Sequence, residues 1–258
     1  MSKGAALPGW RRLPVQAEDL ALALALAAMM LLPLLVVPLR AIHVQIKGQG
    51  SIVQHLTLIA GMIGAAVAAR EGRLLSLSSV DLLFKGTWRR VARSIAAAFA
   101  ATVTALLCLA SVQFVQSERA AGGTGAYDIP LWILQLALPI GFALIALRIL
   151  RRSSDTWRGR AVTVALAGLL VLCVVRPPVP VASLTIPAFA LLLLATVLGA
   201  PIFTVLGGAG LILFWRDGSP IASLTVDHYS LVTNPTLPTV PLFTLAGYFL
   251  AEAARRGA

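Results

Sequence analysis

Ionisable and reactive side chains are scarce in this sequence. Its 258 residues include ten acidic residues, three histidines and two cysteines. The carboxylates all fall between apolar runs or at their ends, so no two of them are placed to share a pocket for acid–base work. The three histidines do not have the spacing of metal ligands. These absences argue against an enzyme, and no covalently bound cofactor is expected. The three histidines are His43, His55 and His228.

The cysteines and the glycine-rich loops do not supply the missing chemistry. Cys108 and Cys173 each lie inside an apolar run, which argues against a disulfide framework. A phosphate-binding loop requires a lysine, and the glycine cluster 122–125 has none. Ser51, after Gly50, lacks the pattern of a nucleophile elbow and is better explained as a helix cap.

Apolar residues, by contrast, make up 59% of the chain, only 12% are charged, and the mean hydropathy is +0.89. This composition predicts an integral membrane protein. The formal net charge of +11 comes from short basic clusters between apolar runs. A nucleic-acid-binding protein would instead show a basic stripe interleaved with exposed aromatics. We interpret the basic clusters as topology signals at the membrane surface. Membrane lipids are the expected partners, and nucleic acid is not.

Five apolar runs are long enough, or nearly so, to cross a membrane. Small residues at Gly61, Gly64 and Ala68 predict that the second span packs closely on its neighbours. His55, near the start of that span, is expected to be buried and hydrogen-bonded. Residues 74–84 mix leucines with serines, which predicts a short helix in the membrane interface. The five predicted spans cover residues 18–39, 52–69, 94–116, 129–150 and 161–175.

Lysines and arginines beside these spans are distributed unevenly. Fourteen of them fall on one side of the predicted membrane and four on the other. Positively charged residues mark the cytoplasmic side. The amino terminus is therefore predicted to be cytoplasmic, with the loop 117–128 outside.

The second span ends in Arg70, Glu71, Gly72 and Arg73. This charged end after a run of alanines resembles the small membrane subunit (DctQ-like) of TRAP transporters, the tripartite ATP-independent periplasmic transporters. A histidine commonly follows the motif in that family, and here Leu74 takes its place. The departure weakens any role that the histidine would have.

Two breaks in apolar runs carry a second resemblance. The first contains Gly199 and Pro201, and the second contains Pro241 and Gly247. Their order and spacing resemble the amino-terminal part of the large (DctM-like) subunit of the same transporters, which makes these four residues candidates for the transport path. Pro and Gly interrupt helices, and membrane transporters use such interruptions at their sites. Taken alone, the first break is better explained by a plain helix hairpin, and an ordinary membrane helix explains the second break equally well.

The expected fold is an all-α polytopic membrane protein with about seven membrane helices, a short interfacial helix and a broken or re-entrant segment near the carboxyl end. Three parts are expected. Residues 1–155 form a small-subunit-like four-helix domain, residues 156–180 a linking helix and turn, and residues 181–258 an amino-terminal fragment of the large permease subunit. The resemblance thus implies a fused polypeptide.

The family resemblance also implies a function: uptake of organic acids, carboxylates such as C4-dicarboxylates, across the bacterial inner membrane. A periplasmic solute-binding protein and the remaining large-subunit segment would be partners, and Na⁺ would be the coupling ion. Because the family's large subunits continue through further spans, the chain is expected to be a truncated or split component that does not transport alone. The alternative is a scaffold or assembly protein with no transport path.

Overall fold

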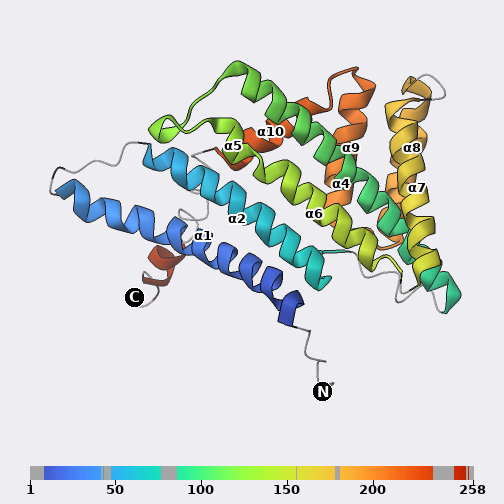
Figure 1. The fold of residues 1–258 in the computed structure, drawn as a ribbon, viewed down its shortest axis with the longest axis horizontal. Coiled ribbons are helices and arrows are strands. Elements are labelled where there is room, and N and C mark those ends of the chain that lie inside the picture. Colours follow the sequence, from blue (N-terminus) through green and yellow to red (C-terminus); the bar gives the residue numbers. More distant parts are fainter. Residues whose placement is uncertain are drawn as a thin grey trace.

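Figure 1 shows the chain as a computed structural model, which describes residues 9–41, 43, 48–76, 86–154, 156–177, 181–234, 247–253 and 255. Nine α-helices and one short 3₁₀ helix make up the elements named within these ranges. Isolated bridges join Ser76 to Pro201 and Thr124 to Pro130. The predicted all-α class is confirmed for the part of the chain that the structure describes.

The helices follow one another through short connections. Their bounds are α1 Gly9–Ala41, α2 Gln49–Glu71, α4 Thr87–Ala121, η1 Ala126–Asp128, α5 Leu131–Gln135, α6 Ala137–Arg152, α7 Trp157–Val175, α8 Val181–Val197, α9 Ile202–Arg216 and α10 Ala222–Val232. Figure 1 shows α1, α2, α6 and α4 side by side, with α7, α8 and α9 grouped at one flank.

Helix α4 is the centre of the bundle and contacts every α-helix from α5 to α10. Six of its fourteen buried residues are alanines, whose small side chains let neighbouring helices approach closely. Three buried hydroxyls on α4 bond to carbonyl oxygens four residues earlier, so they need no water. These are Thr102, Thr104 and Ser111. An alanine-rich helix with internally satisfied hydroxyls therefore fits a water-free core.

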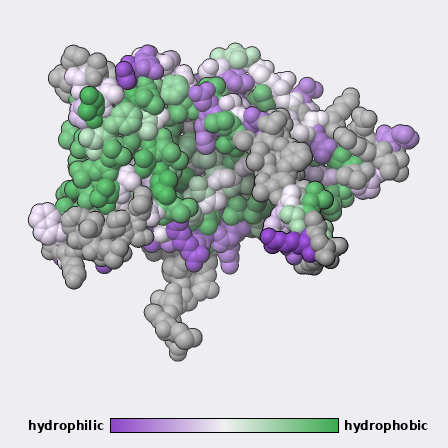
Figure 2. Space-filling view, turned by 180° about the vertical axis from the view of Figure 1, so that it is seen from behind, coloured by the Kyte–Doolittle hydropathy of each residue, from purple (hydrophilic) through white to green (hydrophobic). Residues whose placement is uncertain are grey.

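Among the described residues, five helical stretches are long and apolar enough to cross a membrane: 15–36, 49–71, 88–121, 131–152 and 157–175. They lie where the sequence predicts spans. Helices α8 and α9 are apolar but have only 17 and 15 residues, about 25 and 22 Å against a hydrocarbon core of about 30 Å. The total of about seven membrane helices stays a prediction. Figure 2 shows the corresponding broad hydrophobic area, with hydrophilic residues gathered above and below it.

Two ends of this bundle can be distinguished by charge. The "basic end" holds the carboxyl ends of α2 and α6, the turn between α8 and α9 and the amino-terminal part of α4, with Arg70, Arg93, Arg148 and Arg152. The "opposite end" holds the start of α2, the end of α4, and α5 and α10. The charge asymmetry read from the sequence thus separates two faces of the folded molecule.

The prediction of close packing through Gly61 and Gly64 is wrong. A Cβ added to Gly61 would meet nothing within 4 Å, and one added to Gly64 would only reach Leu22 at 4.0 Å. The tightly packed glycine of this region is Gly141 on α6, where an added Cβ would lie 2.9 Å from the Cβ of Met62 on α2. Helix α2 buries a different face, which carries His55, Leu58, Met62, Ala66 and Ala69.

Two further predictions fall largely or partly outside the described residues. The interfacial helix expected over 74–84 is described only at residues 74–76, which are not helical. The carboxyl-terminal break is described only from Gly247, which begins a helical stretch over 247–253. Pro241 lies outside the described residues, so this break stays a prediction.

Candidate functional site

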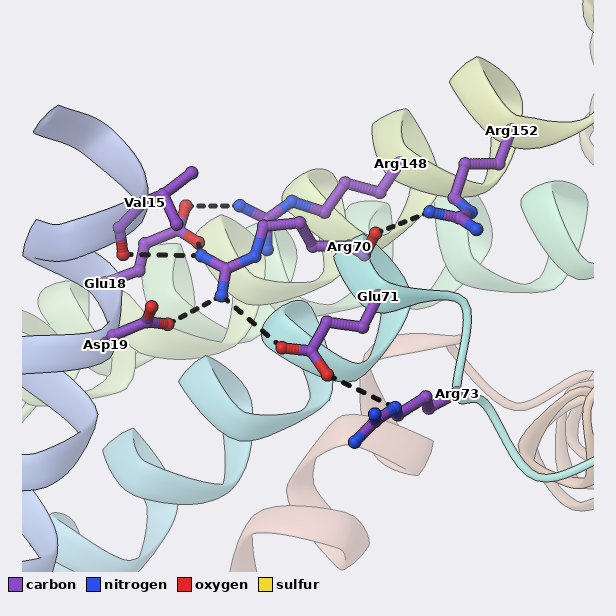
Figure 3. A network of polar contacts seen from close by, with 8 residues as sticks. All are labelled: Val15, Glu18, Asp19, Arg70, Glu71, Arg73, Arg148 and Arg152. Atoms are coloured by element: carbon purple, nitrogen blue, oxygen red, sulfur yellow. Dashed lines mark hydrogen bonds and ion pairs between the residues drawn. The ribbon is translucent and has the colours of Figure 1, made fainter. Parts of the chain in front are cut away.

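A network of charged side chains occupies the basic end, and Arg70 lies at its centre (Figure 3). Its Nη1 donates to Glu18 Oε2 at 3.0 Å, and its Nη2 donates to Asp19 Oδ1 at 2.6 Å. Arg148 on α6 donates to the other oxygen of Glu18. Both carboxylates belong to α1, so this "arginine network" joins α1 to α2 and α6. The side chains of Arg70 and Glu18 are 20% and 26% exposed, which limits screening by water.

Gly72 ends α2 in a conformation that suits glycine. Its φ of 72° is left-handed, and its N–H bonds to the carbonyl of Ala68. A Cβ there would lie 2.5 Å from Nη2 of Arg152, whose Nη1 donates to the carbonyl of Arg70 at 2.7 Å. The glycine therefore both turns the chain and leaves room for a guanidinium over the helix end. A cation at this position also complements the negative end of the helix dipole.

The remaining two motif residues face outward. Arg73 lies 3.5 Å from Glu71 through Nε and Oε2, and its side chain is 81% exposed. Glu71 also lies 3.8 Å from Arg70. Pairs of this kind contribute little to stability because water screens them. Within the motif, Arg70 and Gly72 thus have structural contacts that Arg73 lacks.

The turn between α8 and α9 lies against the loop that follows this motif. Gly199 adopts a φ of 90°, and the N–H of Ala200 bonds to Ala195 O at 2.9 Å, closing α8. The next helix begins at Ile202, whose N–H donates to Leu75 O at 2.8 Å. Two motifs that are over 120 residues apart in the sequence are therefore joined through the backbone. Gly199 and Pro201 meet the loop after Arg70, Glu71, Gly72 and Arg73, a juxtaposition that the sequence does not predict.

A cavity of about 400 Å³ lies between these elements. Its polar lining comes from Arg93 on α4, Arg152 on α6, Ser153 and Ser76. Gly72, Gly199 and Pro201 also line it. Among the described residues, its lining includes no carboxylate. The site is therefore suited to holding an anion.

A separate polar contact was missed by sequence reasoning at the opposite end. His55 is buried, as predicted, and its Nδ1 donates to Ser51 O at 2.7 Å. Its Nε2 is then the acceptor for the hydroxyl of Tyr229 at 2.7 Å. Tyr229 also stacks near Phe114, with ring centroids 5.4 Å apart. No local pattern marks Tyr229 as the partner of His55, because 174 residues separate them.

The remaining residues of interest are Gly247, the possible metal ligands and the two cysteines. Gly247 is exposed, and a Cβ on it would meet nothing within 4 Å. Among the described residues, no group of three or more His, Cys, Asp or Glu side chains could hold a metal ion. Cys108 donates to Pro139 O, and Cys173 is exposed; both are free in the structure.

The fold and this site define a class: a polytopic helical membrane protein whose charged groups are gathered at the ends of its helices. Comparison with protein families gives a particular assignment. Residues 29–159 match the family described as "Tripartite ATP-independent periplasmic transporters, DctQ component". The chain belongs to this family. Comparisons with curated proteins and with solved structures gave no match.

The matched residues run from within α1 to the start of α7 and include Arg70 and Arg148 of the arginine network, whereas Glu18 and Asp19 precede the match. Membership makes the chain a membrane component of a TRAP transporter, which points away from an enzyme and towards the large subunit and the solute-binding protein as partners. With the apolar helices, it also points to a multi-pass protein of the inner membrane.

Proposed function

We propose that this chain combines the small-subunit role with the first part of a large subunit in one TRAP-type uptake system. Residues 1–155 would form the small-subunit domain, 156–180 a link, and 181–258 the beginning of the large-subunit portion. The proposal rests on the backbone hydrogen bond from Ile202 to Leu75. This bond joins the turn that resembles the large subunit to the loop that follows the small-subunit motif. The two segments that resemble different subunits are therefore in contact within this one chain.

In this proposal the system takes organic acids, carboxylates such as C4-dicarboxylates, from a periplasmic solute-binding protein. A sodium gradient drives their entry. The support is the resemblance of residues 198–202 and 240–247 to the large subunit. Gly199, Pro201, Pro241 and Gly247 would lie near the transport path, because breaks at Gly and Pro expose backbone groups that can meet ions and anions.

The small-subunit domain would serve as the scaffold that holds the moving large subunit in the membrane. The arginine network supports this role, since it fixes α1 to α2 and α6 at one end. Orientation follows from the charge asymmetry, with the basic end and the amino terminus in the cytoplasm.

Uptake in cells tests this function. A strain that lacks the native transporter would express the chain with its solute-binding protein and the remaining large-subunit segment, and uptake of labelled dicarboxylates would be measured with and without a sodium gradient. We expect uptake that needs both this chain and the gradient. Uptake that persists without the chain would refute the proposal.

One substitution tests the hydrogen bond that joins the α8–α9 turn to the loop after α2. Ile202 is the first residue of its helix, a position that tolerates proline, and Pro201 before it already has φ −59° and ψ 146°. Ile202→Pro should therefore remove the N–H that bonds to Leu75 while leaving α9 intact. We expect uptake to fall severalfold, with Ile202→Val as the matched control that keeps the bond.

The alternative is a scaffold or assembly protein with no transport path. It is favoured by the three buried hydroxyls of α4, which donate to carbonyl oxygens of their own helix. A pure scaffold predicts that substitutions at Gly199 change the amount of assembled complex and leave the substrate affinity per complex unchanged. Measuring uptake per assembled complex separates the two roles.

Orientation can be tested by cysteine labelling in a background with Cys108→Ala and Cys173→Ala. Thr124→Cys lies exposed in the loop at the opposite end, and Arg158→Cys lies exposed at the start of α7. A membrane-impermeant maleimide added to intact cells with a permeabilised outer membrane should label the first and spare the second. The reverse pattern would invert the topology.

A further inference from the structure

The cavity at the basic end is lined by two kinds of residue. The polar ones are Arg93 and Arg152, with Ser76 and Ser153. The apolar ones are four alanines, Ala69 on α2 and Ala96, Ala97 and Ala100 on α4, together with Leu74, Ile149 and Leu198. We call this apolar part of the lining the alanine wall. Arginines beside an apolar wall fit a ligand with a charged head and a hydrocarbon part.

The described carboxylates near the cavity do not cancel its positive charge. Glu18 and Asp19 are engaged by Arg70 and Arg148, and Glu71 faces Arg70 and Arg73. Arg152 contacts a backbone carbonyl instead of a carboxylate. Within the described residues, neither Arg93 nor Arg152 forms an ion pair. Two positive charges therefore remain for a ligand in the cavity.

The position of the cavity identifies the source of such a ligand. It lies where α2 and α6 end and α4 begins, at the polar boundary of the apolar spans. Basic pockets between membrane helices at this depth face lipid headgroups. A phosphodiester between two arginines accepts strong, charge-assisted hydrogen bonds. Its glycerol and upper acyl chains would then lie along the alanine wall.

We propose that this cavity is a binding site for the headgroup of an anionic phospholipid. The phosphate lies between Arg93 and Arg152, with Ser76 as a further donor, because the hydroxyl of Ser153 already donates to Leu150 O. Because Gly199 and Pro201 line the same cavity, the bound lipid contacts α4, α6 and the α8–α9 turn together. The lipid therefore strengthens the seat of the α8–α9 turn on the small-subunit portion. The inference concerns a structural lipid and does not depend on the transported solute.

Lipid titration of the purified full chain tests this site. The chain, delipidated in a neutral detergent, would be titrated with phosphatidylglycerol, and its thermal unfolding and native mass spectrum recorded. We expect a saturable rise in Tm and a retained lipid adduct. Phosphatidylcholine at the same mole fraction should give a much smaller rise, and a rise equal to that with phosphatidylglycerol would overturn the proposal.

Charge-matched variants locate the effect. Arg93→Gln with Arg152→Gln removes both cavity arginines, whereas Arg151→Gln with Arg158→Gln removes two exposed arginines of the same end that do not line it. We expect the first pair to weaken apparent lipid affinity by at least about tenfold and the second to change it less than about threefold. Equal losses in the two pairs would show a general surface effect and refute the site.

Two further arms keep the test decisive if Arg152→Gln impairs folding, given its bond to Arg70 O. Ala97→Leu narrows the cavity and leaves both arginines in place, so it should also abolish the lipid-dependent rise in Tm. Glycerol 3-phosphate and inorganic phosphate, at matched phosphate concentration, should give no comparable rise. Stabilisation by these soluble anions equal to that by the lipid would assign the cavity to a free phosphate and overturn the lipid proposal.

Discussion

Helix α2 lies between α1 and α6, and its two sides are held in different ways. On the α6 side the backbones approach closely, because Gly141 leaves space for Met62. On the α1 side a Cβ added to Gly64 would reach only Leu22, at 4.0 Å, and the ion pairs of Arg70 with Glu18 and Asp19 add to the packing of the two helices. The α6 side thus contains the tighter steric fit, and the α1 side contains the ion pairs of α2, at one end.

This difference follows from where each contact lies in the membrane. Charges are costly at membrane depth, so the arginine network is confined to the end of the spans. Packing between small residues needs no water and works along the length of a helix. Helix α1, of which only 11% of the span is buried, depends on its end contacts more than α6 does. Substitutions on the two sides should therefore differ in size and in salt dependence.

The largest effect is expected on the α6 side. Gly141→Ala would place a Cβ 2.9 Å from Cβ of Met62, and both atoms belong to rigid parts of their residues. Overpacking of this kind costs about 1–3 kcal/mol, to be measured as loss of unfolding free energy in detergent. Gly61→Ala is the matched control, because its Cβ meets nothing within 4 Å. The control should be neutral or gain about 0.5–1 kcal/mol from helix propensity. Equal destabilisation of both variants would contradict the close α2–α6 approach.

The α1 side can be tested by a double-mutant cycle on Arg70 and Glu18. The variants Arg70→Gln, Glu18→Gln and their combination should give a coupling free energy of about 1–2 kcal/mol, as expected for a partly buried charge-assisted bond. The coupling should shrink with added salt, whereas the effect of Gly141→Ala should not. A coupling near zero at low salt would show that α1 is held by other contacts.

Much of the framework could be predicted because it rests on local pattern. Apolar run length places the five long spans, and the burial of His55 follows from its position inside one of them. The predicted packing face of α2 is wrong, because small residues show where another helix can approach closely but not which helix does. In the structure the close approach of α2 and α6 occurs at Gly141, a glycine of α6. A one-dimensional pattern does not record which neighbour faces each residue.

The site shows the same limit. The sequence identifies Arg70 and Gly199 as members of motifs, but their association through Leu75 and Ile202 is a backbone contact, which no side-chain pattern encodes. The carboxylates that engage Arg70 come from α1, about 50 residues away, and Glu18 reads in the sequence only as a charge at the end of a span. Long-range pairing is set by the packing of whole helices.

A third contact of α2, at the opposite end, should be weaker than either. Tyr229→Phe removes the hydroxyl that donates to Nε2 of His55 and keeps the ring near Phe114. We expect a loss of about 0.6–1.5 kcal/mol in unfolding free energy, the range of hydrogen bonds between membrane helices. Tyr248→Phe, at an exposed tyrosine, is the control and should be neutral. A larger loss at Tyr248 than at Tyr229 would show that α10 does not depend on His55.

The smallest effect is expected at Arg73, which completes the comparison within a single motif. Arg70 and Arg73 lie three positions apart, yet Arg70 contacts two carboxylates of α1 while Arg73 faces solvent and lies 3.5 Å from Glu71. Because an exposed pair gains little, Arg73→Gln should change the unfolding free energy by less than about 0.5 kcal/mol. Thermal unfolding beside Arg70→Gln checks this. A loss at Arg73 comparable to that at Arg70 would mean that the motif acts as one charged cluster, and that the division between a structural arginine and a solvent-facing one is wrong.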